Sequence, residues 1–258
     1  MSEAPATNGE EEELAEGTLL SHLIELRSRL IKMTAAVIGL FVVLLPFSQD
    51  IFETVAQPLV DVLPGQQMIA TEVASSLLTP FKTTFFVALF LAMPVVLYQV
   101  WAFVAPGLYR KEKRFAFPLL ATSILLFYAG IAFAYFVVFP LVFGFFTAVT
   151  PANVEMMTDI ASYLDFIIKI VLAFGLAFEV PVATVLIVWT GLTTPEKLGK
   201  ARPYVFLTCF VVGMFLTPPD VISQTLLAVP VYILYELGLL MSKLFAPRRA
   251  GEAEAGQP

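Results

Sequence analysis

The sequence predicts an all-α integral membrane protein with six transmembrane helices, both termini in the cytoplasm, and bent helices that form a concave wall. Three observations lead to this fold class: long apolar runs, an uneven distribution of basic residues, and prolines inside the runs. Hydrophobic residues make up 59% of the 258 residues, charged residues 14%, and the mean hydropathy is +0.85. A soluble domain carries about 25% charged residues. Because an open sheet edge is not tolerated in lipid, we expect the spans to be helices.

Six apolar segments are candidates for crossing the bilayer, over residues 30–47, 81–104, 115–139, 163–189, 203–217 and 221–241. The fifth is short, because 17 residues separate Arg202 from Asp220. They span about 26 Å as a helix, against a hydrocarbon core of ~30 Å. We therefore expect the bilayer to thin there, or a partner to cover the mismatch. The "PPD" connection at 218–220 predicts a tight hairpin between the last two spans.

Basic residues predict the orientation. All but two of the 15 Lys and Arg residues lie on alternate connections, and residues 48–80 contain none. Basic connections stay in the cytoplasm, so both termini are predicted to lie there. The basic residues on these connections are Arg27, Arg29, Lys32, Arg110, Lys111, Lys113, Arg114, Lys197, Lys200, Arg202, Lys243, Arg248 and Arg249.

Other segments refine this outline. Residues 51–64 are predicted to form a short amphipathic helix along the outer surface, broken by Pro58. Prolines at 94, 118, 181 and 230 are predicted to bend their helices into a curved wall, because each removes a backbone hydrogen bond. The acidic residues 1–17 are predicted to be a disordered tail, residues 18–245 the membrane domain, and residues 246–258 a second disordered tail.

Composition excludes most enzyme classes. The chain has one cysteine, Cys209, and one histidine, His22, so an intrachain disulfide, a cysteine-based zinc site and a histidine pair on a metal are ruled out. The sequence contains no nucleotide-binding loop. We expect no enzymatic activity, no cofactor and no nucleic-acid partner.

The segment 21–30, "SHLIELRSRL", predicts an amphipathic helix on the cytoplasmic surface that leads into the first span. One side carries Leu19, Leu23, Leu26 and Leu30, and the other carries His22, Glu25, Arg29 and Lys32. Glu25 is either the partner of Arg29 at i,i+4, a contact worth ~0.3–0.5 kcal/mol when exposed, or a functional carboxylate.

Two more acidic residues call for an explanation. Glu112 lies among four bases in "YRKEKR" (109–114), which keep it ionised whether it is a screened surface residue or a binding group. Glu179 in "AFEVP" lies inside the fourth span, where a charge costs roughly 2.5–3.5 kcal/mol, so it is a functional candidate. Its structural alternative is a protonated residue or a partner of Lys169. Pairing with Lys169 is not expected, because ten residues of helix separate the two by about 15 Å.

Several blocks of the sequence together resemble the TatC family, the large six-span subunit of the twin-arginine protein translocase. They include "SHLIELRSRL", "YQVWAFVAPGLYRKEKR", "FGLAFEVPVA" and "VVGMFLTPPDVISQTLLAVP", and the resemblance extends from about residue 19 to 245. It implies a receptor in the bacterial plasma (inner) membrane for signal peptides of folded precursors that carry an Arg-Arg pair.

The resemblance also implies site residues. Glu25 and Glu112 match the two carboxylates that contact the arginines, and Trp101 and Phe103 match aromatic contacts. Leu108 and Tyr109 flank the basic loop and are further candidate contacts. A guanidinium takes a carboxylate in a two-pronged arrangement that lysine cannot reproduce.

Inside the membrane, the resemblance implies that Glu179 faces a concave surface, where it thins the bilayer or meets a partner helix. Met214, Thr217 and Gln224 match a docking site for the single-span subunits TatA and TatB, in a complex with several copies. Without the resemblance, Thr217 is a helix-end hydroxyl and Gln224 a first-turn residue in the headgroup zone.

Two other classes remain as alternatives. A proton- or ion-coupled secondary transporter would use Glu179, but it needs a polar midplane cavity that these apolar spans barely offer. An intramembrane aspartyl protease needs two aspartates in the membrane, and the acids within the predicted spans are Asp165, Glu179 and Glu236.

Overall fold

The computed structural model describes residues 8–62, 68–104, 116–151, 158–217 and 220–245, and apart from one isolated β-bridge its regular structure is helical. Five helices are long and apolar enough to cross a membrane, and a sixth, Arg202–Leu216, is shorter. The prediction of an all-helical multi-span protein with a short fifth span is confirmed. The elements are α1 (Asn8–Leu44), a 3-10 turn (Leu45–Phe47), α2 (Ser48–Val62), α3 (Ser75–Val104), α4 (Ala116–Phe133), a π-helical turn (Ala134–Val138), α5 (Phe139–Val149), α6 (Ile160–Ala177), α7 (Val180–Trp189), α8 (Pro195–Lys200), α9 (Arg202–Leu216) and α10 (Val221–Phe245).

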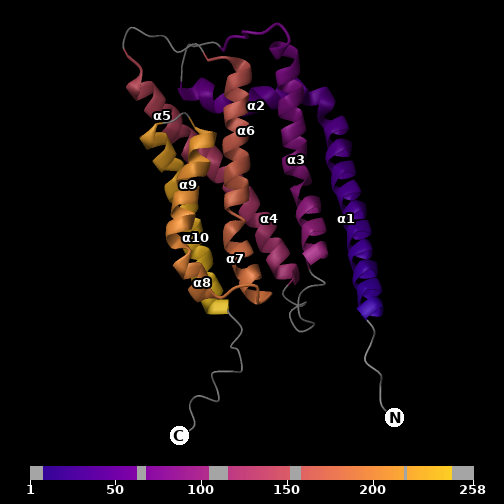
Figure 1. Cartoon of the computed structure of the whole chain (residues 1–258). Helices are drawn as coiled ribbons and strands as arrows, with labels where there is room; N and C mark the ends of the chain where they lie inside the picture. The colour runs from indigo at the N-terminus through magenta and orange to yellow at the C-terminus, as the bar shows by residue number, and fades with distance from the viewer. Residues whose placement is uncertain (1–7, 63–67, 105–115, 152–157, 218–219, 246–258) are drawn as a thin grey trace, which may run out of the picture.

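The helices stand roughly side by side, with α2 lying across one end (Figure 1). Helix α3 packs against α1, α4 and α6, while α10 packs against α7 and α9. The predicted hairpin of the last two spans is therefore present. The start of α1, the end of α3, the end of α7 and the end of α10 all lie at the end of the bundle opposite α2.

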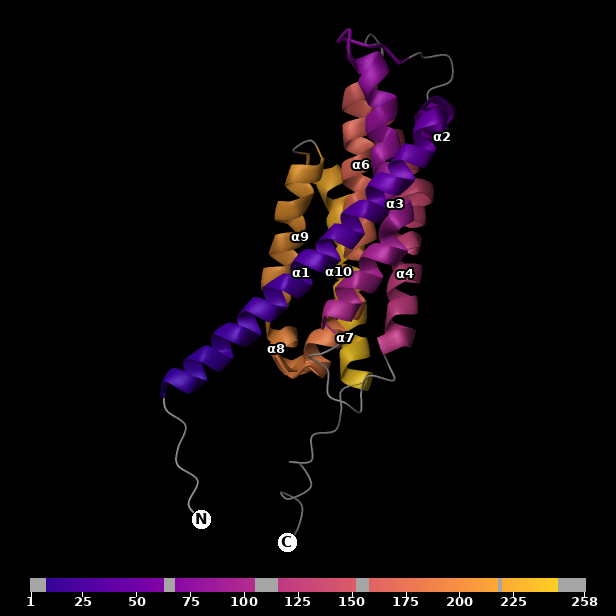
Figure 2. The ribbon, with the colours of Figure 1, turned by 90° about the vertical axis from the view of Figure 1, so that its right-hand side faces the viewer.

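Helix α1 differs from the predicted surface helix. It is one continuous helix that begins at Asn8, inside the predicted acidic tail, and continues the first span without a break, because residues 18–38 contain neither Gly nor Pro. Its N-terminal half stands away from the other helices (Figure 2). The predicted leucine stripe is exposed at Leu23, Leu26 and Leu30, whereas the polar side turns Arg29 toward α3. Exposed leucines are compatible with a membrane helix, because lipid is as good a neighbour for leucine as protein.

The predicted amphipathic helix at the outer surface is α2, and it packs against α3 and α5. It runs unbroken through Pro58, so the predicted break is wrong. The end of the molecule capped by α2 is closed further by Ile69 and Asp159. The backbone N–H of Ile69 donates to Thr158 at 3.0 Å, and that of Ile160 donates to Ile69 at 2.9 Å.

Asp159 also caps α6. Its carboxylate accepts from the backbone N–H of Ser162 at 2.9 Å and from the N–H and hydroxyl of Thr71 at 3.2 and 2.9 Å. These bonds, the one from Ser162 first, lower the pKa of the Asp159 carboxyl from 3.8 to about 2. One side chain thus joins the segment before α3 to the start of α6.

The prolines act differently from the prediction. Pro94 and Pro230 lie inside α3 and α10, as expected. Pro118 does not bend a helix, because it lies in the first turn of α4, where its missing N–H has no intrahelical acceptor. The third span also continues to Val149 instead of ending at 139. Pro140 is tolerated there because it is the second residue of α5, which follows the π-helical turn in which the N–H of Phe139 donates to Ala134.

Glycines set the close contact between α4 and α6. A Cβ added at Gly175 would lie 2.7 Å from the ring of the fully buried Phe127, and one at Gly130 would lie 2.5 Å from the carbonyl oxygen of Phe174. Only a residue without a side chain fits at either position. This packing brings the middle of α4 beside the junction of α6 and α7.

Candidate functional site

Glu25 lies on α1 and is paired with Arg29 one turn later. Arg29 Nε and Nη2 both donate to Glu25 Oε1, at 3.0 and 2.5 Å. The Glu25 side chain is 37% exposed and that of Arg29 18%. The i,i+4 pair expected from the sequence is present, and the carboxylate remains accessible from outside.

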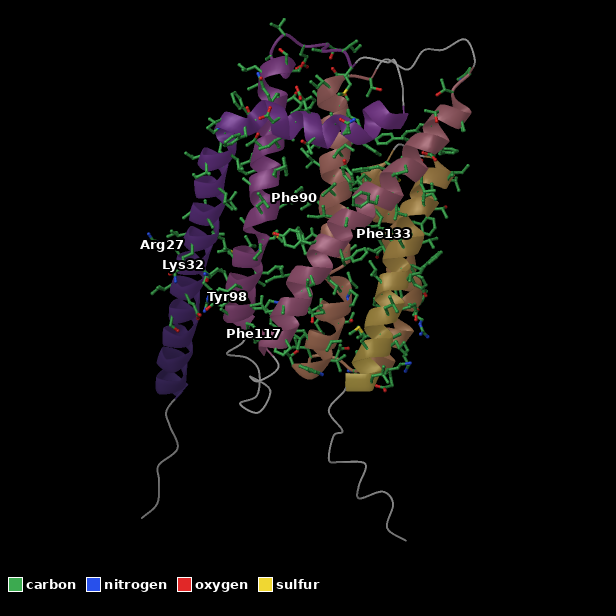
Figure 3. The ribbon with its side chains drawn as sticks, turned by 180° about the vertical axis from the view of Figure 1, so that it is seen from behind. Arg27, Lys32, Phe90, Tyr98, Phe117 and Phe133 are labelled. Carbon is green, nitrogen blue, oxygen red and sulfur yellow. The ribbon has the colours of Figure 1, made fainter. Side chains whose placement is uncertain are left out.

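Arg29 also reaches across to α3. Its Nη1 donates to Gln99 Oε1 at 3.2 Å, and its Nη2 donates to the carbonyl oxygen of Ala102 at 3.0 Å. Arg27 and Lys32 instead project from the side of α1 that faces away from α3 (Figure 3), and both are exposed. Of these three basic residues, Arg29 is the one that lies between α1 and α3.

The predicted aromatic contacts lie close to this network. Trp101 is 7% exposed and packs in a cluster with Met93, Leu97, Phe127 and Val182. Phe103 is half-buried in the last turn of α3. The remaining predicted site residues, Leu108, Tyr109 and Glu112, lie outside the described residues. The structure therefore brings Glu25 and the end of α3 together, with Trp101 in the core.

Glu179 lies where the fourth span breaks between α6 and α7. The N–H of Glu179 donates to Leu176 at 3.1 Å, a tightened turn, and Pro181 follows with no N–H to donate. Ser123 of α4, which is 1% exposed, donates its hydroxyl to Glu179 Oε2. Glu179 Oε1 is buried without a partner among the described residues. Lys169 is exposed and does not bond to Glu179, so Ser123 is the described partner that the sequence did not predict.

The hairpin of α9 and α10 uses two of its three predicted docking residues internally. The Thr217 hydroxyl donates to the carbonyl of Gly213 at 3.0 Å, and the Gln224 amide donates to the carbonyl of Phe210 at 2.6 Å. Gln224 also packs against Gly213, where an added Cβ would lie 3.2 Å from its Cγ. Met214 is 49% exposed. The structure groups the three around the contact of α9 with α10.

Two ion pairs escaped the sequence analysis. Arg202 donates to both carboxylate oxygens of Glu236, at 2.7 and 2.8 Å, and Tyr232 donates to the same carboxylate at 2.9 Å. Lys82 pairs with Asp165 between α3 and α6. The i,i+4 spacing of Tyr232 and Glu236 could have indicated their hydrogen bond. No local pattern predicts the two ion pairs, because Arg202 and Glu236 are 34 positions apart and Lys82 and Asp165 are 83 positions apart. Among the described residues, no group of three His, Cys, Asp or Glu side chains could hold a metal ion.

Comparison with known proteins identifies the family. Residues 21–230 match the family model described as TatC, Sec-independent protein translocase protein. The chain belongs to the TatC family. The resemblance seen in the sequence is thereby confirmed, and membership makes this chain a component of a protein translocase and not an enzyme.

TatC relatives cover nearly the whole chain. A TatC from Azotobacter chroococcum mcd 1 is 58% identical over 239 residues, 92% of this chain and 94% of the relative. One from Escherichia coli (strain K12) is 55% identical over 237 residues, 92% of each chain. Two solved structures, each described as the twin-arginine translocase receptor TatC, match with TM-scores of 0.79 and 0.80 at 37% and 36% identity. They cover 86% of this chain and 98% and 99% of their own chains.

Proposed function

We propose that this chain is the receptor and core subunit of a twin-arginine translocase, which binds Arg-Arg signal peptides of folded precursors at its cytoplasmic face. The TatC family match over residues 21–230 is the observation that carries this proposal. The geometry of Glu25 supports it. Its accessible carboxylate lies near the end of α3, and the basic segment 109–114 follows α3 in the sequence.

In this proposal Glu25 and Glu112 each accept one arginine of the signal. A hydrogen bond to a charged group contributes about 1.5–3 kcal/mol, so two contribute ~3–6, whereas micromolar binding needs about 8 kcal/mol. The apolar segment of the signal supplies the remainder by packing on exposed apolar helix surface. Phe103, Leu108 and Tyr109 are further proposed contacts, and the buried Trp101 supports the end of α3.

We place the protein in the bacterial plasma membrane, with both termini cytoplasmic. The proposal rests on the basic residues of the alternate connections. Those that the structure describes lie in the N-terminal part of α1, in α8, at the start of α9 and in the last turn of α10, and all of these segments lie at one end of the bundle. The basic-free segment 48–80 contains α2, at the other end. The charge distribution and the arrangement of the helices thus agree on one orientation.

The outer end of α9 and α10 is the proposed docking site for TatA- and TatB-type subunits in a multi-copy complex. Met214 offers exposed apolar surface, and Gln224 Oε1 accepts no hydrogen bond from the described residues. A polar group in a partner helix would gain about 0.6–2 kcal/mol from one bond there, which suits a weak, exchangeable contact. Helix α9 has 15 residues, about 22 Å, so lipid or a partner helix must cover the mismatch.

Neither of the two pockets that the structure describes supports the transporter alternative. Two pockets are described, one of about 410 Å³ between α6, α9 and α10 and one of about 490 Å³ between α1, α3 and α6. Glu179 lines neither of them. A coupling carboxylate in a transporter would face such a cavity.

The test is site-specific crosslinking of a signal peptide in membranes that contain the whole complex. Cysteines are placed beside Glu25 and beside Glu112, in a Cys209→Ala background, and are probed with peptides that carry Arg-Arg or Lys-Lys. We expect strong Arg-Arg crosslinks at both positions and weak Lys-Lys crosslinks, because lysine forms no two-pronged contact.

Carboxylate variants provide the control. Glu25→Gln and Glu112→Gln should each remove most of the preference for Arg-Arg. Glu53→Gln, an exposed carboxylate on α2 at the opposite end, should leave it unchanged. Crosslinking that ignores the arginine pair, or that survives both glutamate variants, would refute the proposed site.

A further inference from the structure

Arg29 makes more contacts than a surface partner of Glu25 needs. Three groups accept its hydrogen bonds: the Glu25 carboxylate on α1, and the Gln99 side chain and Ala102 carbonyl on α3. Ala102 lies in the last turn of α3, where backbone carbonyls lack intrahelical donors. Arg29 therefore caps α3 from a neighbouring helix while it holds Glu25.

This arrangement leaves half of the Glu25 carboxylate available. Both Arg29 nitrogens bond Oε1, and no described residue donates to Oε2. A carboxylate has about four acceptor positions, so the pair with Arg29 does not saturate it. The Gln99 side chain, which is 9% exposed, fixes the guanidinium from the other side. The free oxygen is thus presented in one orientation at a partly exposed position.

We propose that Arg29 is a positioning residue that fixes the Glu25 carboxylate for a planar guanidinium and so sets the preference of the site for arginine over lysine. The inference rests on the proposed function, because it assumes that Glu25 accepts an arginine of the signal. A two-pronged contact requires an acceptor of fixed orientation. An ammonium group, as a point charge, binds a mobile carboxylate equally well. Loss of Arg29 should therefore lower selectivity more than it lowers overall cation binding.

Two other roles for Arg29 predict different results. If Arg29 were an internal competitor that blocks Glu25, its removal would raise the affinity for an Arg-Arg peptide. If it only joined α1 to α3, its removal would weaken Arg-Arg and Lys-Lys binding by the same factor.

The experiment measures binding of fluorescent Arg-Arg and Lys-Lys signal peptides to the intact complex in membranes. For Arg29→Gln we expect Arg-Arg affinity to fall about tenfold, the equivalent of one charge-assisted hydrogen bond, with Lys-Lys affinity changed less than about twofold. Arg29→Lys should behave similarly, because lysine keeps the positive charge but lacks the planar guanidinium that bonds several acceptors in fixed directions. Lys32→Gln, an exposed base one turn further along α1, is the matched control and should leave both affinities unchanged.

Gln99→Met keeps the test decisive where the Arg29 variants do not assemble. It removes one anchor of the guanidinium at similar volume, and we expect the ratio of the two affinities to fall about threefold. A rise in Arg-Arg affinity, an equal loss for both peptides, or an unchanged ratio in these variants overturns the inference. Glu25→Gln distinguishes failure of the proposed function from failure of this inference. If Glu25→Gln leaves the ratio of Arg-Arg to Lys-Lys affinity unchanged, Glu25 does not bind the signal. If Glu25→Gln abolishes that ratio but the Arg29 and Gln99 variants do not change it, only the proposed role of Arg29 fails.

Discussion

At the scale of single residues, a neutral hydroxyl is the described partner of the carboxylate inside the fourth span. Ser123 donates to Glu179 Oε2 from α4, and the other oxygen is buried without a described partner. A lysine in place of Ser123 would tie Glu179 permanently, whereas one hydrogen bond from a serine is readily exchanged for another donor. This arrangement suits a group that meets a lipid or a partner helix in the membrane.

Removal of the Ser123 hydroxyl should therefore destabilise the protein. Ser123→Ala removes the described donor of Glu179 Oε2, so that neither carboxyl oxygen has a described partner, at a cost of about 1–3 kcal/mol. We expect a lower melting temperature of the detergent-solubilised chain. Thr122→Val is the matched control, because the Thr122 hydroxyl bonds only to the Pro118 carbonyl of its own helix in the described structure. Equal melting temperatures for Ser123→Ala and the unmodified chain would contradict the assigned contact.

The sequence predicted contacts within one helix better than contacts between helices. Local spacing predicted the Glu25–Arg29 pair and the interruption of the helix before Pro181. It did not predict Ser123 as the partner of Glu179, or Gln99 as an anchor of Arg29. Both contacts join separate helices, 56 and 70 residues apart, and depend on how the helices rotate about their axes. Apolar spans give weak signals for that rotation, because lipid-facing and protein-facing positions are both apolar.

At the scale of helices, the contact between α7 and α10 depends on one glycine. A Cβ added at Gly238 would meet the Thr184 hydroxyl and lie 2.8 Å from the Pro181 Cα. The Thr184 hydroxyl is itself bonded to the Pro181 carbonyl at 2.8 Å, so neither neighbour moves freely. Close helix approach of this kind is how membrane helices gain packing energy without a hydrophobic driving force.

Gly238→Ala should push α10 away from α7. Overpacking at a rigid contact costs about 1–3 kcal/mol, which thermal unfolding in detergent would detect. Gly39→Ala is the matched control, since an added Cβ there meets nothing within 4 Å. Because alanine loses less backbone entropy than glycine when a helix forms, Gly39→Ala should stabilise α1 slightly, by up to about 1 kcal/mol. A Gly238→Ala variant as stable as Gly39→Ala would show that the contact yields easily.

Helix existence was more predictable than helix extent. The six apolar segments appear as helices in order, because backbone groups in lipid must be satisfied within each span. Some ends differ from the prediction near prolines: α2 continues through Pro58, where a break was predicted, and the third span continues past Pro140, although it was predicted to end at 139. The effect of a proline depends on its distance from the helix start and on whether a π-helical turn precedes it.

At the scale of the whole molecule, charge and architecture divide the protein into two ends. The end with the basic connections carries Glu25, Arg29 and the end of α3, while the other carries α2 and the Asp159 contacts. The predicted orientation assigns the first end to the cytoplasm. The domain boundaries and the concave wall of the prediction stay predictions.

Accessibility labelling checks this orientation. In a Cys209→Ala background, Asp50→Cys on α2 should react with a membrane-impermeant maleimide added to spheroplasts, because Asp50 is exposed at the predicted outer end. Lys197→Cys on α8 should react only after the plasma membrane is opened. The reverse pattern would invert the topology and with it the proposed location of the signal-peptide site.

The link between Ile69 and Asp159 also bears on how the chain is made. The two partners are 90 residues apart, and each lies just before a spanning helix, α3 or α6. As the ribosome makes the protein from its N-terminus, Ile69 has no partner until Asp159 and its neighbours have been synthesised. The end of the bundle that carries α2 thus closes only once the first 160 of the 258 residues are in place, and a nascent chain halted before that point would leave it open.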